Sequence, residues 1–404
     1  MPLDPAADAD WAPLKKHWIL RRDTTYLNHG SFGPPPAAVR ERREHWQHKL
    51  DTQPMDFFVR EFEPAWLAAR GALAKLVGAE PGNLIFAENA TVAMNIVADS
   101  FPLAAGDEVL LTDHEYGAVQ RIWQRACEKS GAAAKTVELP LPVQSSAQLL
   151  EVIFSAASQH TRLIVVSHIT SPTAIILPVE EICREAQRRG IAVAIDGPHA
   201  IAQLPLAIER LGCDFYTASC HKWLSGPIGS GFLYVAPRHQ ARVRPPVLSW
   251  GRIPPTKIAS WSDEFVWVGT RNPAAYLAVP AAIEFLEQVG LPAFRSRTHW
   301  LAQYARRRLL ELTGGQPLVP DEPAWYGSMA HVPLPPPAGC KVGGESCPIS
   351  NPLQNTIWQR FGIEVPVVEF RGTRYLRVSC HLYNDTEQLD RLVTGLKSLL
   401  GEGH

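Results

Sequence analysis

The sequence lacks any run of eighteen uninterrupted apolar residues, and its first residues, MPLDPAADADW, contain no basic segment followed by an apolar one. A membrane-spanning helix needs about 20 mostly apolar residues, and a secretory signal needs those two segments in that order. We therefore expect a cytoplasmic chain that neither spans nor is anchored to a membrane.

The sequence also lacks an excess of charge of either sign. Its 39 lysine and arginine residues nearly balance its 40 aspartate and glutamate residues, and no run of like charge stands out. A surface that binds nucleic acid or anionic lipid requires a concentration of basic residues. The balance of charge therefore argues against both partners and favours a small-molecule substrate.

Cysteine is scarce, and the seven residues show no CxxC spacing. A zinc site needs a set of four closely placed ligands, so no metal site is expected. We expect most of these cysteines to be buried free thiols. Cys340 and Cys347 share a glycine-rich stretch, where a disulfide is the alternative.

Short apolar segments alternate with longer amphipathic ones between about Tyr26 and Thr270. This alternation is typical of parallel strands joined by helices, so we predict an α/β fold whose large domain has a mostly parallel sheet flanked by helices, such as Val179–Arg189. The predicted strands are Leu84–Ala87, Glu108–Leu111, Leu163–Val166, Ala192–Ile195, Phe215–Ala218 and Gly231–Val235.

A chain of 404 residues is long enough to bury a second, smaller core. We predict an N-terminal arm over residues 1–28, a large domain over 29–273 and a small α+β domain over 274–404. Helices are expected in this small domain at Ala274–Val289, Arg295–Leu312 and Thr386–Leu400. The proline- and glycine-rich stretch Val332–Ser350 predicts a loop or an edge element, because proline cannot donate a hydrogen bond to a sheet.

Two reactive side chains are expected at one edge of the large sheet. The apolar strand AVAI delivers Asp196 at its carboxyl end, and a later strand leads through Ser-Cys-His to Lys222. Pyridoxal 5′-phosphate (PLP) needs a lysine amine for a Schiff base and an acid that keeps its pyridine nitrogen protonated. Alone, such an aspartate is more often a helix cap and such a lysine a surface charge. Together they predict a PLP site.

The motifs that carry these residues, D-G-x-H, S-x-H-K-W and G-P-x-G-x-G, resemble those of the class V aminotransferase family, within the fold-type I PLP enzymes. The resemblance extends from YLNHGSFGPPP to LRVSCHLYND. It implies the fold-type I PLP-dependent transferase fold, with Lys222 as the Schiff-base lysine and Asp196 as the partner of the pyridine nitrogen. It also implies that His199 donates to the phenolic oxygen of the cofactor. The alternative for His199 is a hydrogen-bonded core histidine.

The cofactor phosphate is expected where the strand LIFA is followed by a helix. Backbone amides and hydroxyls at a helix N-terminus bind phosphate, which makes Ala90 and Thr91 candidates, although Thr91 has the alternative role of an ordinary N-cap. The resemblance implies that Ser219 and His221 form a second clamp. It also implies that Thr270, in WVGTRNP, reaches the phosphate of a partner subunit, so a homodimer with shared sites is expected.

Other candidates surround the expected ring and substrate. Tyr116, in DHEYGA, stands where the desulfurase branch has a stacking histidine, and its alternative is a tyrosine packed under a loop. Ser171 occupies the place of an asparagine near the cofactor oxygen. The resemblance implies that Arg377 grips the substrate carboxylate through two parallel donors, whereas a surface ion pair is the alternative. It also implies that Asn28 and His29 enter the active site from the N-terminal arm.

The segments HEYGAV, SHITSPTAIILPV and SCHKWLSGPIGSGFL most resemble the isopenicillin N epimerase-like branch. A desulfurase would need a cysteine shortly before Arg377, and the stretch from Trp358 to Ser379 contains none. We expect epimerase or C–S lyase chemistry, in which Lys222 removes the Cα proton and, for epimerisation, Tyr116 or a water returns one. Class V transamination with a keto acid is the alternative. A catalytically silent binding module is disfavoured by the intact Lys222, Asp196, Thr91 and Arg377.

Overall fold

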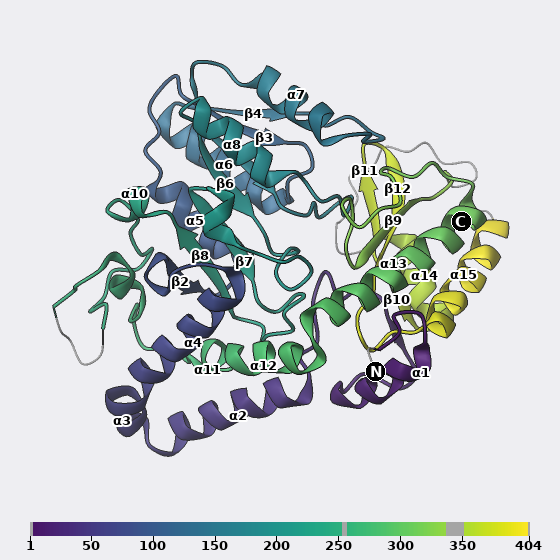
Figure 1. The fold of residues 1–404 in the computed structure, drawn as a ribbon, viewed down its shortest axis with the longest axis horizontal. Helices are drawn as coiled ribbons and strands as arrows, with labels where there is room; N and C mark the ends of the chain where they lie inside the picture. The colour runs from purple at the N-terminus through teal and green to yellow at the C-terminus, as the bar shows by residue number, and fades with distance from the viewer. Residues whose placement is uncertain (1–2, 253–256, 337–350, 403–404) are drawn as a thin grey trace.

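The computed structural model describes residues 3–252, 257–336 and 351–402. A large sheet with its covering helices forms one part, and a smaller sheet with α13 (Leu291–Thr313) and α15 (Thr386–Gly401) forms the other (Figure 1). The possible Cys340–Cys347 disulfide lies outside the described residues. The predicted divisions at 28/29 and 273/274 stay a prediction.

The large sheet has seven strands in the order β2-β8-β7-β6-β5-β3-β4. Neighbours from β7 to β4 pair in parallel, whereas β8 is antiparallel to both β7 and β2. The strands are β2 (Leu84–Ala87), β3 (Glu108–Thr112), β4 (Ala133–Val137), β5 (Thr161–Ser167), β6 (Ala192–Asp196), β7 (Phe215–Ser219) and β8 (Gly231–Val235). All six predicted strands are present. The edge strand β4 was not predicted, because AAKTV is mostly exposed and has no apolar face.

Apart from the edge strand β4, both faces of this sheet are buried, as is typical of parallel sheets. In β5, Leu163 and Val165 pack into the core that includes Trp123 of α6, whereas Ile164 and Val166 pack into the core on the other face. Each such side chain contributes about 1.5–3 kcal/mol on burial. The helices of the large part are α2 (Ala37–Thr52), α3 (Pro54–Asp56), α4 (Phe62–Val77), α5 (Ala90–Ser100), α6 (Gly117–Ser130), α7 (Ser146–Ala156), α8 (Val179–Arg188), α9 (Ile208–Leu211) and α10 (Pro237–Gln240).

A three-stranded antiparallel sheet in the order β11-β12-β9 lies beside the large one. Its strands are β9 (Met329–Pro333), β11 (Val367–Phe370) and β12 (Thr373–Ser379). Val332 and Pro333, from the stretch predicted to be a loop or an edge element, therefore belong to an edge strand, where proline is tolerated. A separate parallel pair, β1 (Thr25–Tyr26) with β10 (Ile363–Glu364), ties the N-terminal arm to this part.

The remaining helices are α1 (Asp8–Trp11), α11 (Ala274–Leu277), α12 (Val279–Val289) and α14 (Pro352–Phe361). The single helix predicted over Ala274–Val289 is divided at Ala278, because Pro280 lies in the first turn of α12. In the part of the chain that the structure describes, no single helix is long and apolar enough to cross a bilayer. Two consecutive helical segments, Ala274–Val289 and Leu291–Thr313, are long and apolar enough when taken together, but they are bent by 79° relative to each other.

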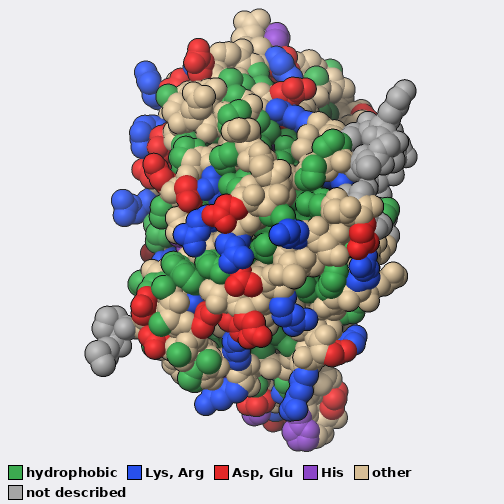
Figure 2. Space-filling view, turned by 90° about the vertical axis from the view of Figure 1, so that its right-hand side faces the viewer, with side chains coloured by type: hydrophobic (Ala, Val, Ile, Leu, Met, Phe, Trp, Pro, Cys, Tyr) green, Lys and Arg blue, Asp and Glu red, His purple; other side chains and the backbone are tan. Residues whose placement is uncertain are grey.

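The surface in Figure 2 carries basic and acidic side chains interspersed with apolar ones. This face shows no large area of one charge, in keeping with the balanced composition.

Candidate active site

Lys222 and Asp196 meet at the carboxyl ends of neighbouring parallel strands. Asp196 is the last residue of β6, and Lys222 follows the end of β7 by three residues. Lys222 Nζ lies 3.1 Å from His199 Nε2. Burial, together with the positive charge of Arg377, lowers the pKa of Lys222 to about 8. The amine is therefore more easily deprotonated than an ordinary lysine, as a nucleophile or base requires.

The hydrogen bonds of His199 determine which ring nitrogen carries its proton. Trp223 Nε1 donates to His199 Nδ1 at 3.2 Å, and an indole nitrogen is only ever a donor. Burial keeps the pKa of His199 well below its ordinary value, so the ring is neutral. Nδ1 is then the acceptor and Nε2 carries the proton toward Lys222 Nζ. This tautomer matches the donor role expected of His199.

Asp196 is a buried acid with one oxygen already engaged. Thr217 Oγ1 donates to Asp196 Oδ1 at 2.9 Å, which leaves Oδ2 for another donor. Burial raises the pKa of Asp196 to about 6. A cationic N–H beside this carboxyl would favour its ionised form, so the site suits a protonated pyridine nitrogen.

A second buried acid, Glu115, lies close to Asp196 and was not predicted. Glu115 accepts hydrogen bonds from Thr112 Oγ1 at 2.6 Å and Ser167 Oγ at 2.7 Å. Burial raises its pKa to about 7, and the charge of Asp196 adds to the rise. The position of Glu115, one residue before the candidate Tyr116, was a signal in the sequence that it could belong to the site. This signal is weak, because an acid that precedes a helix is commonly a capping residue.

The start of α5 faces the end of β7, where the phosphate is expected. Ala90 N donates to Ser219 Oγ at 3.0 Å, and Asn89 is the N-cap, accepting from the backbone of Val92 at 2.9 Å. His221 Nδ1 is buried without a hydrogen-bond partner among the described residues. Thr91 is in the first turn of α5. Helix amides, hydroxyls and an unpaired imidazole nitrogen fit a phosphate group.

Arg377 projects from β12 and joins three segments of the chain. Its Nη1 donates to the carbonyl of Ser171 at 2.7 Å, and its Nη2 donates to Ser31 Oγ at 2.8 Å. Burial lowers the pKa of Arg377 to about 10, while the nearby Tyr116 opposes this shift. The side chain is 5% exposed and makes no ion pair within the described ranges, so the surface ion-pair alternative is wrong. Tyr116 itself is 50% exposed.

The N-terminal arm contacts the backbone of Lys222. His29 Nε2 lies 2.9 Å from the carbonyl oxygen of Lys222, and His29 Nδ1 lies 2.9 Å from Tyr383 Oη. A Cβ on Gly33 would meet that carbonyl at 2.7 Å, so only glycine fits there. Asn28 donates to Glu364 at 3.3 Å. Both nitrogens of His29 thus have protein partners, and the contact of Asn28 and His29 with substrate stays a prediction.

His29 also gives the protein a testable dependence of stability on pH. Burial lowers its pKa from 6.5 to about 3. As the pH falls below 6.5 the unfolded chain binds a proton at this ring and the folded protein does not, so stability is lost. We expect the free energy of unfolding to decrease more steeply with falling pH in wild type than in His29→Gln. The difference between the two slopes should be up to about 1.4 kcal/mol per pH unit. Equal slopes in urea titrations would contradict this.

Comparison with known proteins identifies the family to which this chain belongs. Residues 58–392 match the family model described as Aminotransferase class-V. The chain is 36% identical to isopenicillin N epimerase of Streptomyces clavuligerus, over 98% of this chain and 100% of that protein. It is 31% identical to putative L-cysteine desulfhydrase 1 of Oryza sativa subsp. japonica, over 93% and 83% of the two chains.

A solved structure supports the same fold. A variant of C-DES with glycine covalently linked to the PLP cofactor has a TM-score of 0.79 at 22% identity, covering 93% of this chain and 97% of that one. The predicted fold-type I architecture and the PLP cofactor are confirmed. Because the family match and the full-length relatives agree, the chain belongs to the class V aminotransferase family of PLP-dependent enzymes.

Proposed function

We propose that this protein is an isopenicillin N epimerase-like enzyme that acts at the Cα of an amino acid, by epimerisation or by C–S bond cleavage. The observation that carries the proposal is the meeting of Lys222, His199 and Asp196 at one sheet edge, with the cationic Arg377 near enough to affect the pKa of Lys222. The relatives named epimerase and cysteine desulfhydrase support both chemistries.

The residues around this edge suit each part of the cofactor. Lys222 would hold it covalently, Asp196 would bind the ring nitrogen, and His199 would donate to the phenolic oxygen. When bound, PLP supplies an electron sink that stabilises negative charge at Cα. The phosphate would rest on Ala90, Thr91, Ser219 and His221, with Tyr116 covering the ring and Ser171 beside it.

Three residues then perform the steps at the substrate. Arg377 holds the α-carboxylate through its planar fork, which fixes the Cα–H bond relative to the lysine. Lys222, with its lowered pKa, accepts the Cα proton. For epimerisation a second acid returns a proton to the opposite face, and Tyr116, which is half exposed, is the candidate beside a water. Cleavage of a C–S bond needs only a leaving group at Cβ.

The products formed from a panel of amino acids test this function. An epimerase interconverts enantiomers with no change of the cofactor, and a lyase releases a keto acid with ammonia. Either result supports the proposal. Stoichiometric conversion of the cofactor to pyridoxamine phosphate, reversed by a keto acid, would instead establish the alternative, a class V aminotransferase. Absence of any turnover across the panel would favour a silent binding module.

Arg377→Ala should weaken the binding of substrate by roughly 2–4 kcal/mol, because two charge-assisted hydrogen bonds are lost. The absorbance of the bound cofactor should not change. Substrate Kd measured by spectral titration checks this. Arg374→Ala is a matched control, since Arg374 lies three residues away on the same strand and donates to the carbonyl of Pro335. Equal affinity in Arg377→Ala and wild type would refute the role.

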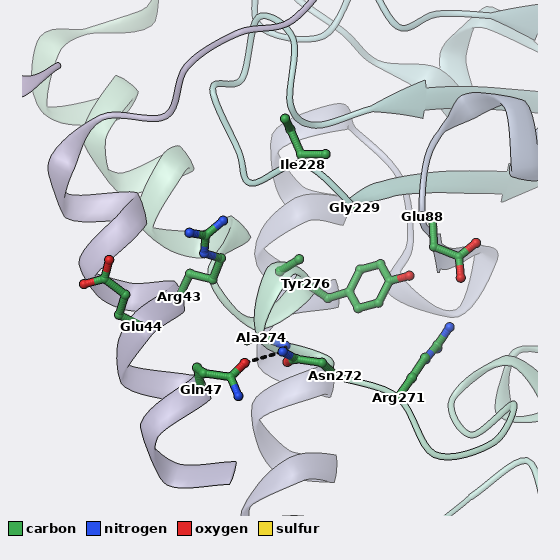
Figure 3. A pocket seen from close by; sticks show the side chains of 11 residues that line it. Arg43, Glu44, Gln47, Glu88, Ile228, Gly229, Arg271, Asn272, Ala274 and Tyr276 are labelled. Carbon is green, nitrogen blue, oxygen red and sulfur yellow. Dashed lines mark hydrogen bonds between the residues drawn. The ribbon is translucent and has the colours of Figure 1, made fainter. Parts of the chain in front are cut away.

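We further propose a homodimer in which Thr270 completes the phosphate site of the partner. Thr270 is exposed and precedes Arg271 and Asn272, which line a hollow of about 520 Å³. In Figure 3, Asn272 donates to Gln47 of α2 on one side of this hollow, and Ile228 lies on another. Ile228 is apolar yet 64% exposed, as is typical of a surface that a partner covers.

Thr270→Ala should weaken PLP binding by about 10- to 100-fold, the effect of losing one hydrogen bond to a charged group. The oligomeric state should not change. PLP affinity by dialysis and mass by light scattering measure the two effects. Thr52→Ala is the control, since Thr52 is an exposed threonine whose side-chain hydrogen bonds, among the described residues, go to its own helix. A fully active monomer would contradict the shared site.

A further inference from the structure

His331 lies directly across from Arg377. The two residues are paired in the antiparallel register of β9 and β12, so their side chains project from the same face of the sheet. His331 is 7% exposed and stacks on Tyr375 with ring centroids 4.3 Å apart. The ring is therefore held in place beside the residue that we assign to the substrate carboxylate.

Among the described residues, this buried ring lacks a hydrogen bond of ordinary geometry. By distance and angle, neither nitrogen of His331 has one within the described residues, although the carbonyl of Pro172 lies near enough to act as a weak acceptor that raises its pKa. Buried polar side chains are nearly always paired, so two open nitrogens in one ring indicate groups kept for a ligand. Pro172 follows Ser171, whose carbonyl binds Arg377, so His331 and Arg377 face the same loop.

The charge of His331 is fixed by its surroundings. Burial and the positive charges of Arg377 and His114 hold its pKa well below the ordinary value, so the ring is neutral. A neutral imidazole offers one N–H donor and one acceptor. It does not compensate a buried carboxylate, and the neighbouring Arg377 would repel an ammonium group.

A second unpaired imidazole nitrogen lies nearby. His114 Nδ1 is 2.9 Å from the carboxylate of Asp113, which can only accept from it, so Nδ1 carries a proton. His114 Nε2 is buried without a partner in the described segments. Two buried imidazole rings near each other, His331 and His114, therefore have nitrogens without a partner in the described residues.

We propose that His331 is a specificity-determining residue that selects amino acids with an uncharged, hydrogen-bonding side chain, such as a carboxamide. The carboxamide oxygen accepts a hydrogen bond from His331. The proposal rests on the proposed role of Arg377, which places the substrate beside this ring. An apolar side chain would leave the histidine nitrogens unpaired. A charged one would be buried beside a neutral ring, with Arg377 already bound to the α-carboxylate.

Isosteric amino acids test this specificity. We expect wild type to bind asparagine and glutamine about 10- to 100-fold more tightly than leucine and norleucine, and more tightly than aspartate and glutamate. Calorimetric Kd and kcat/KM for each amino acid are the measurements. Equal binding of asparagine and leucine, or a preference for a charged side chain, would overturn the proposal.

Variants of the ring separate recognition from folding. His331→Phe keeps the stacking on Tyr375 but not the hydrogen bonds, so the preference for carboxamides should disappear while the affinity for leucine is retained. His331→Gln restores a donor and an acceptor and should recover part of the preference, even if His331→Phe folds poorly. Tyr375→Phe is the control and should leave the preference intact. An unchanged preference in both His331 variants would refute the assignment.

A failure of the proposed role of His331 can be distinguished from a failure of the proposed function. If no amino acid loses its Cα proton in wild type, the proposed function fails. If Cα exchange proceeds for many amino acids without a carboxamide preference, only the role of His331 fails.

Discussion

Lys222→Ala will abolish the covalent attachment of PLP and lower activity by at least about 10²- to 10⁴-fold, the contribution of one acid–base group. Lys222 is a buried amine next to the proton-carrying nitrogen of His199, and no other lysine is among the candidate site residues. The protein should lose the absorbance of its covalent cofactor, and borohydride reduction should give no adduct by mass spectrometry.

Lys75→Ala is the matched control for this loss, because Lys75 is an exposed lysine near the end of α4. Its adduct should form at wild-type yield. If Lys222→Ala also formed the reduced adduct at wild-type yield, the lysine would have been wrongly assigned.

Asp196→Asn should keep the cofactor bound but reduce turnover by about 30- to 5,000-fold. The amide can still accept from Thr217, so the local geometry is preserved, but the negative charge opposite the ring nitrogen is lost. Removing one partner of a buried charged pair costs roughly 2–5 kcal/mol, which gives this range. Steady-state rates with cofactor content measured on the same sample test it. Unchanged turnover at full cofactor content would remove Asp196 from the mechanism.

The fold could be predicted from the sequence where local chemistry decides it. Strands such as Leu163–Val166 are continuous apolar runs because both faces of the sheet are covered. The pattern failed for β4, whose residues are exposed at the sheet edge, and for the division of the helix near Ala278 by Pro280. Whether AAKTV forms a strand depends on its pairing with β3, and whether the helix is divided depends on the single position of Pro280.

The candidate site was predictable where it lies at strand ends. Asp196 and Lys222 each follow a recognisable strand, so their meeting follows from the topology of a parallel sheet. Ser31, Glu115 and His331 were not predicted. Ser31 meets Arg377 across 346 positions of sequence, and His331 faces Arg377 only through the register of β9 and β12. Such contacts appear only when the strands are paired in space.

In the proposed reaction, Lys222 removes the Cα proton of a bound amino acid. Exchange of the Cα hydrogen in heavy water, followed by NMR with a substrate found in the amino-acid panel, tests it most directly. Wild type should introduce deuterium at Cα, and Lys222→Ala should introduce essentially none while Lys75→Ala exchanges normally. Exchange in Lys222→Ala at the wild-type rate would contradict the claim.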